Sequence, residues 1–100
     1  MMRTLERVKS SLRITHGKFD DTLLEPLIEA CRRDLMAAGV SQENALSEVN
    51  ILVERAIIHY CHINFPLNGD IRETERHERA YTSLRDRLAL VGDDLSLKTY

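Results

Sequence analysis

The segment that decides the fold is VNILVERAIIHYCHI at residues 49–63, the most strongly periodic stretch of the chain. Its apolar side chains recur three and four positions apart, which is the spacing of a helix face, and they include Val49, Leu52, Val53, Ala56, Ile57 and Tyr60. Isoleucines at positions 51, 58 and 63 extend the apolar surface beyond one face. A helix of this kind is buried centrally or faces a second subunit. We therefore predict a helix that is either central in the fold or covered by a second subunit, and that ends at the FPLNG segment of residues 65–69.

Two segments on the N-terminal side carry a single apolar face. The first predicts a short helix from Thr4, its N-cap, to about Leu12, which the HGK sequence of residues 16–18 interrupts. The second predicts a longer helix that either Asp20 or Asp21 caps, because a carboxylate favours the positive end of a helix. This longer helix is expected to end near Gly39, a typical residue for the position after a helix.

The remaining segments complete the outline. Pro26 is expected near the first turn of the second helix, where a missing N–H costs little. Residues 41–47 are polar and predict a turn or a frayed helical turn. The last helix is expected to begin at Asp70 and to end before the GDD sequence of residues 92–94. The final segment, LSLKTY at residues 95–100, alternates apolar and polar side chains and predicts an extended tail.

The composition agrees with a helical fold. A chain of 100 residues buries enough surface for one modest core, and 43% hydrophobic with 30% charged residues is typical of a folded soluble domain. With 5% aromatic residues and no Trp, the core must be aliphatic, which suits packed helices. We predict an all-α fold, a small bundle of one short and three longer helices in a single domain over residues 1–94, with an extended C-terminal tail over residues 95–100.

The charge and the apolar pattern exclude several classes of protein. The formal net charge of −2 argues against a protein that holds nucleic acid through bulk positive charge. No stretch approaches the ~18 consecutive apolar residues of a membrane span, and the N-terminal residues do not resemble a signal peptide. Cys31 and Cys61 both lie in apolar, helix-like surroundings and are expected to be reduced and buried. We therefore expect synthesis in a reducing cytoplasm and no membrane association.

One group of side chains suggests chemistry. His59 and His62 lie one helical turn apart and, with Cys61 or Cys31, contain the atoms that bind zinc. The spacing fits no common zinc pattern, however, and Cys61 projects about 100° away from His62 and about 160° away from His59. We favour a buried cysteine beside two partly buried histidines, and we predict no metal site. No sequence motif indicates a catalytic residue or a cofactor site.

The charged stretches indicate contacts with other proteins. Of the 14 basic residues, 11 are arginine, the cation that interfaces favour. In the stretch at residues 72–79, glutamates alternate with arginines as they do on a solvated face or at the rim of an interface. The tail is too apolar for a free end and is expected to pack on this domain or on a neighbour. The predicted partner-contact residues are Arg32, Arg33, Arg72, Arg76, Arg79, Leu95, Leu97 and Tyr100.

Several segments, taken in order, resemble one family. They are TLERVKSSLRI (4–14), FDD (19–21), LEPLIEAC (24–31), RAIIHYC (55–61), ERAYTSLRDRL (78–88) and LVGD (90–93). Each is an ordinary helix pattern, but their order and spacing resemble the small head–tail connector (DNA-packaging, head-completion) proteins of long-tailed double-stranded DNA phages and prophages. The chain departs from the family pattern at Pro26 and in the ample NGD loop of residues 68–70.

The resemblance implies a non-enzymatic virion protein at the head–tail junction, made in the bacterial host cytoplasm. Such proteins form a ring of about a dozen copies, dock on the portal protein and offer a surface to the next head-completion or tail protein. Double-stranded DNA passes through the channel without sequence-specific binding. Two alternatives stay open. A small helical DNA-binding regulator or packaging-recognition module would need an exposed basic helix, and an enzyme would need metal at His59, Cys61 and His62.

Overall fold

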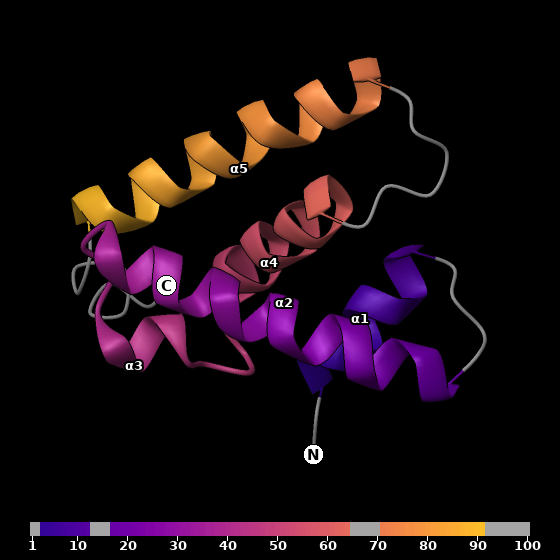
Figure 1. The fold of residues 1–100 in the computed structure, drawn as a ribbon. Helices are drawn as coiled ribbons and strands as arrows, with labels where there is room; N and C mark the ends of the chain where they lie inside the picture. Colours follow the sequence, from indigo (N-terminus) through magenta and orange to yellow (C-terminus); the bar gives the residue numbers. More distant parts are fainter. Residues whose placement is uncertain (1–2, 13–16, 65–70, 92–100) are drawn as a thin grey trace.

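The computed structural model of the chain describes residues 3–12, 17–64 and 71–91 (Figure 1). These residues form five helices: α1 (Arg3–Leu12), α2 (Gly17–Ala37), α3 (Gln42–Ala45), α4 (Ile51–Asn64) and α5 (Ile71–Val91). They contain no strand, which confirms the predicted all-α fold. The predicted FPLNG break, the Asp70 cap and the predicted tail with Leu95, Leu97 and Tyr100 lie outside the described residues. No helix of the described part is long and apolar enough to cross a bilayer.

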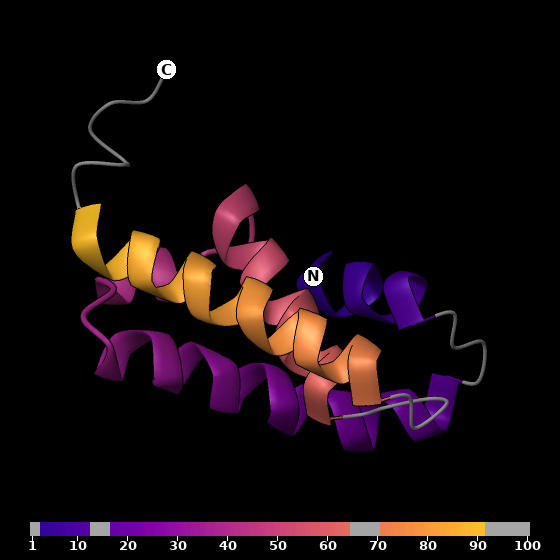
Figure 2. The ribbon, with the colours of Figure 1, turned by 90° about the horizontal axis from the view of Figure 1, so that it is seen from above.

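Of the two settings predicted for α4, the structure shows the central one. Helices α1, α2 and α5 all pack against α4, and Figure 1 shows α5 on one side of α4 with α1 and α2 on the other. Seen from above in Figure 2, α5 is the outer layer and lies over α4. The side chains of Val53, Ala56, Ile57 and Cys61 are fully buried. Its apolar surface is wide because two layers of helices cover it.

The core is aliphatic, as predicted. It joins α1 and α2 to α4, and it receives Tyr81 and Leu88 from α5. The fully or nearly fully buried apolar residues from the other helices and their connections are Leu5, Val8, Leu12, Leu24, Ile28, Cys31, Leu35, Val40, Ala45, Val53, Ala56, Ile57 and Cys61. Burying such side chains contributes roughly 25 cal/mol per Å² of apolar surface.

The start of α2 differs from the prediction. The helix begins at Gly17, so Gly17 and Lys18 are its first two residues and do not interrupt the helical structure. Asp20 and Asp21 therefore lie inside the helix and not at its cap. Acidic residues are favoured throughout the first turns of a helix as well as at its cap, so their presence does not fix the first residue. As a result Pro26 lies in the interior of α2 and not near its first turn. Its exposed ring is accommodated on the solvent side of the helix.

The end of α2 is as predicted. Gly39 has a φ of +114°, which favours glycine, and its N–H donates to the carbonyl of Met36 at 3.0 Å. The N–H of Val40 donates to the carbonyl of Leu35 at 3.0 Å, and this pair of bonds is a Schellman motif. The motif turns the chain back towards the core and buries Val40.

Residues 41–47 take the second of their two predicted forms, and the start of α1 needs a correction. The predicted helical turn is the short helix α3, whose N-cap Ser41 accepts a hydrogen bond from the N–H of Asn44 at 3.2 Å. Thr4 is not the N-cap of α1 because that helix already includes Arg3. Helix α5 spans the whole described segment Ile71–Val91, and the predicted start at Asp70 and stop at residues 92–94 lie outside the described residues.

Candidate interaction surfaces

Arg32 is a buried residue whose hydrogen bonds join three parts of the chain. From α2, its Nη1 donates to the carbonyl oxygens of Ala45 at 2.8 Å and Ser47 at 3.0 Å. Its Nη2 donates to Oε2 of Glu48 at 2.9 Å, and the N–H of Thr4 donates to Oε1 of the same carboxylate at 2.8 Å. The guanidinium therefore ties the start of α1 and the α3–α4 connection to α2.

This position changes the interpretation of Arg32. The residue is only 7% exposed, and its donors are used inside the subunit, so we no longer assign it to a partner contact. A sequence signal for this role exists: Arg32 follows Ile28 by four positions and precedes Leu35 by three, which places it on the apolar face of α2. Arg33, the next residue, is exposed and forms an ion pair with Glu29 at 3.5 Å. It remains available for a partner.

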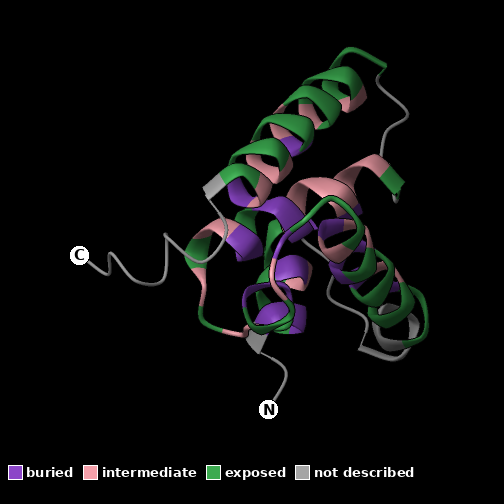
Figure 3. Cartoon of the chain, turned by 90° about the vertical axis from the view of Figure 1, so that its left-hand side faces the viewer, coloured by how far each residue is buried: buried purple, intermediate pink, exposed green. Residues whose placement is uncertain are grey.

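The outer side of α5 carries what we call the arginine strip. In a helix of 3.6 residues per turn, its members fall within about 80° of one another around the axis. All are exposed, whereas Tyr81 and Leu88 on the opposite side are buried, and Figure 3 shows α5 exposed along its outer side. The strip comprises Arg72, Arg76, Arg79, Ser83, Arg87 and Leu90. Sequence reasoning identified three of its arginines and missed Arg87.

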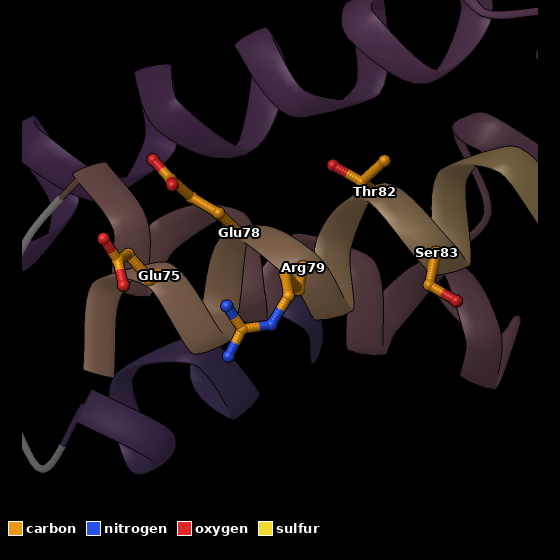
Figure 4. A pocket seen from close by; sticks show the side chains of 5 residues that line it. All are labelled: Glu75, Glu78, Arg79, Thr82 and Ser83. Carbon is orange, nitrogen blue, oxygen red and sulfur yellow. The ribbon is translucent and has the colours of Figure 1, made fainter. Parts of the chain in front are cut away.

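A shallow depression of about 500 Å³ borders the strip on the same helix. Figure 4 shows its lining: Arg79 and Ser83 point to one side of α5, whereas Glu78 and Thr82 point to the other. The arginines are thus separated around the helix from Glu78, although they alternate with glutamates along the sequence. The strip is a positively charged line with acidic residues beside it.

A second surface, the acidic groove, lies between α2 and the α3–α4 connection. Its volume is about 360 Å³, and its lining combines three carboxylates with two apolar side chains and the buried Arg32. The lining residues are Glu25, Ile28, Glu29, Arg32, Leu46 and Glu48. Three large apolar residues at this corner are exposed, namely Leu46, Val49 and Ile51. Exposed apolar residues that gather in this way mark contact surfaces.

The histidines form a cluster that joins three helices. Nδ1 of His59 on α4 and Nδ1 of His77 on α5 share a hydrogen bond of 2.9 Å. The ring of His62 stacks on that of His77 with centroids 4.3 Å apart, and its Nε2 is hydrogen-bonded to Oγ of Ser11 on α1 at 2.8 Å. Burial, together with the neighbouring His77, lowers the pKa of His59 and of His62. Their surroundings therefore favour the neutral rings of His59 and His62.

The cysteines are not placed for metal binding or nucleophilic chemistry. Cys61 is fully buried in the core, and among the described residues no group of three histidine, cysteine or acidic side chains is arranged to hold a metal ion. Burial raises the pKa of both the Cys31 and the Cys61 thiol to about 12. A protonated thiol is a poor nucleophile.

A network on the other side of the core ties α5 to α2. The Tyr81 hydroxyl donates to Oδ2 of Asp34 at 2.5 Å, and Nη1 of Arg85 lies 3.4 Å from the same oxygen. Burial and this hydrogen bond raise the pKa of Tyr81 well above its ordinary value. The arrangement fixes the rotation of α5 about its axis, and hence the direction in which the arginine strip faces.

The family of phage gp6-like head-tail connector proteins matches the chain over residues 2–75. The chain belongs to this family. Membership gives the connector a structural role in the phage particle and confirms the predicted resemblance. The match covers α1 to α4 and the first turn of α5, so the resemblance at residues 78–88 and 90–93 stays a prediction. No curated protein and no solved structure matches the connector.

Proposed function

We propose that this connector assembles into a ring at the head–tail junction, where it docks on the portal protein and continues the DNA channel towards the next head-completion or tail protein. Membership in the connector family is the observation that carries the proposal. In this role the chain is not an enzyme, and it holds no cofactor or metal. Raised thiol pKa values and surroundings that favour the neutral rings of His59 and His62 are consistent with a structural role.

A ring subunit needs separate surfaces for its neighbours, and the connector has two of different chemistry. One is the arginine strip of α5, and the other is the acidic groove with the exposed apolar corner beside it. We propose Arg33, Arg72, Arg76 and Arg79 as partner-contact residues, together with Leu95, Leu97 and Tyr100 of the tail. Arginine suits this use because its guanidinium pairs bidentately with carboxylates.

The relation of the connector to DNA follows from its charge. With a net charge of −2 the chain has little bulk attraction for phosphate, which suits a channel through which DNA slides. A DNA-binding regulator would instead place an exposed helix of mainly basic residues in the major groove. Here Glu75 and Asp86 lie close beside the arginine strip and weaken its potential. We therefore favour protein contacts.

The proposal is tested by the mass and shape of the assembled protein. Native mass spectrometry and negative-stain electron microscopy are applied to the chain alone and mixed with the portal protein of the same phage. We expect closed rings of about a dozen subunits, alone or on the portal. A chain that stays monomeric in both samples would contradict ring formation. Duplex binding that falls steeply with salt, without any ring, would support the DNA-binding alternative.

A further inference from the structure

We propose that the arginine strip of one subunit docks against the acidic groove of the next subunit, so that the copies contact one another head to tail. This inference rests on the proposed ring and specifies which surfaces form it. A contact between two different surfaces of the same chain is heterologous, and it produces a closed ring when the rotation between copies closes.

The charges of the two surfaces are complementary. The strip holds four arginines, of which Arg76, Arg79 and Arg87 form no ion pair within the part of the chain that the structure describes. The groove presents Glu25, Glu29 and Glu48, and the adjoining segment at residues 42–54 contains no lysine or arginine. Glu48 is paired with the buried Arg32 and Glu29 with the exposed Arg33, whereas Glu25 forms no ion pair within the described residues. The Arg33–Glu29 pair is exposed and lies on one helix, so it is weak, and an arginine of a neighbour can take the place of Arg33 at Glu29.

The apolar residues are complementary as well. Leu90, at the C-terminal end of the strip, is 86% exposed, an unusual position for a leucine at the end of a row of arginines. Leu46 lines the groove, and Val49 lies beside it at the same exposed corner. An interface that buries leucine against these residues and surrounds them with ion pairs has an apolar centre and a polar rim.

The two surfaces face different directions, as a head-to-tail contact requires. In Figure 1, α5 runs along one edge of the molecule, whereas α3 and its connection to α4 lie along the opposite edge. The bond from Tyr81 to Asp34 fixes how α5 is rotated relative to α2, which carries half of the groove. The strip and groove of one subunit therefore do not contact each other, and both remain open to other copies.

Charge reversal in two variants tests the contact. The first variant carries Arg76→Glu and Arg79→Glu, and the second carries Glu25→Arg and Glu29→Arg. Each variant alone brings like charges together at every contact, and we expect its self-association to fall on the order of 100-fold from that of the native chain. In an equimolar mixture, however, reversed strips meet reversed grooves and native strips meet native grooves. The mixture should therefore assemble as alternating copies.

The mixture acts as the matched control, because it contains the same substitutions as the separate samples. Association is measured by sedimentation velocity at millimolar protein, and circular dichroism checks that each variant is folded. Variants that assemble as well as the native chain would overturn the inference and leave the proposed ring intact. Two variants that fail alone and also fail when mixed would overturn it too. A native chain that associates neither alone nor with the portal protein would instead remove the proposed ring, and the contact with it.

DNA is the alternative ligand of the arginine strip, and the same variants distinguish DNA binding from the contact between subunits. If the strip faced DNA, Arg76→Glu with Arg79→Glu would abolish the retention of a duplex by the protein at low salt and leave assembly unchanged. That result would overturn the head-to-tail contact. Loss of assembly, restored by mixing, supports it.

Discussion

Replacing Arg32 by methionine tests whether this buried side chain holds the subunit together. The substitution keeps the length and apolar part of the side chain but removes every donor. Two backbone carbonyl groups, those of Ala45 and Ser47, then lose a charged donor, and the carboxylate of Glu48 loses its cation. Arg33 provides the matched control, because it is adjacent in sequence but its side chain is 75% exposed, against 9% for Arg32.

The expected loss in the free energy of unfolding follows from how deeply each bond of the arginine is buried. A buried hydrogen bond from a charged group contributes about 1.5–3 kcal/mol, which applies to the bond to Ala45. The Glu48 side chain is 37% exposed, so solvent screens its ion pair and we count at most about 1 kcal/mol for it. Together with the partly buried bond to Ser47, the loss is about 3 kcal/mol, a large share of the ~5–15 kcal/mol that stabilises a domain. For Arg33→Met we expect less than about 0.5 kcal/mol, the value of an exposed pair four residues apart on a helix.

Urea denaturation followed by circular dichroism measures both free energies of unfolding. Thermal unfolding should show the same order, with Tm lowered by roughly 15 °C for Arg32→Met and by a few degrees at most for Arg33→Met. If Arg32→Met lowered the free energy of unfolding by less than about 1 kcal/mol, or if the two variants cost the same, Arg32 would not have the structural role assigned to it. A partner-contact role for Arg32 would then return.

Three more predictions follow from the histidine cluster, the end of α2 and the cysteines. Because the folded state lowers the pKa of His59 and His62, their contribution to stability is complete above the ordinary pKa of 6.5 and is lost as the pH falls below it. Urea denaturation between pH 7 and about 5 should show this decline, and a double His→Gln variant that declines equally would contradict it. Gly39→Ala should cost about 1 kcal/mol in the same assay from the positive φ alone, since an added Cβ would lie 3.5 Å from Cβ of Ala89, an ordinary contact. Cys31 and Cys61 should react with a thiol reagent only as fast as the chain opens, and rapid labelling of the native protein would show that their burial is incomplete.

Much of the fold is predictable from the sequence because helix ends and apolar faces are local signals. The wide apolar face at residues 49–63 limits α4 to a central or a subunit-facing position, and the end of α2 follows from Gly39, a residue typical of the position after a helix. The start of α2 is not predictable in this way. Helix α2 includes Gly17 and Pro26 although glycine costs about 1 kcal/mol and proline about 3 kcal/mol inside a helix, and its packing on α1 and α4 outweighs these costs.

The candidate surfaces were harder to predict, for a different reason. The partners of Arg32 on the α3–α4 side lie 13 to 16 positions away in the chain, and no local pattern brings them together. Only part of the histidine cluster could be predicted from the sequence. His59 and His62 lie one turn apart on the same helix, whereas His77 lies among arginines and contacts the other two histidines only because α5 packs on α4. The arginine strip could be recognised once the helix extends to Leu90, since its members repeat every three to four positions.

The central place of α4 also decides how the subunit comes apart. Helices α1, α2 and α4 contact one another in all three pairs, whereas α5 packs mainly on α4. Helix α5 forms the most extensive helix–helix interface of the described residues, with α4, and its Tyr81 is bonded to Asp34 of α2, whereas α1 packs on α4 and α2 through smaller interfaces. In native-state hydrogen exchange, the amides of the short helix α1 should therefore exchange before those of α4 and α5, with a lower opening free energy. A neighbour that covers α5 in an assembly would slow exchange in that helix further and so supply stability that the isolated subunit lacks.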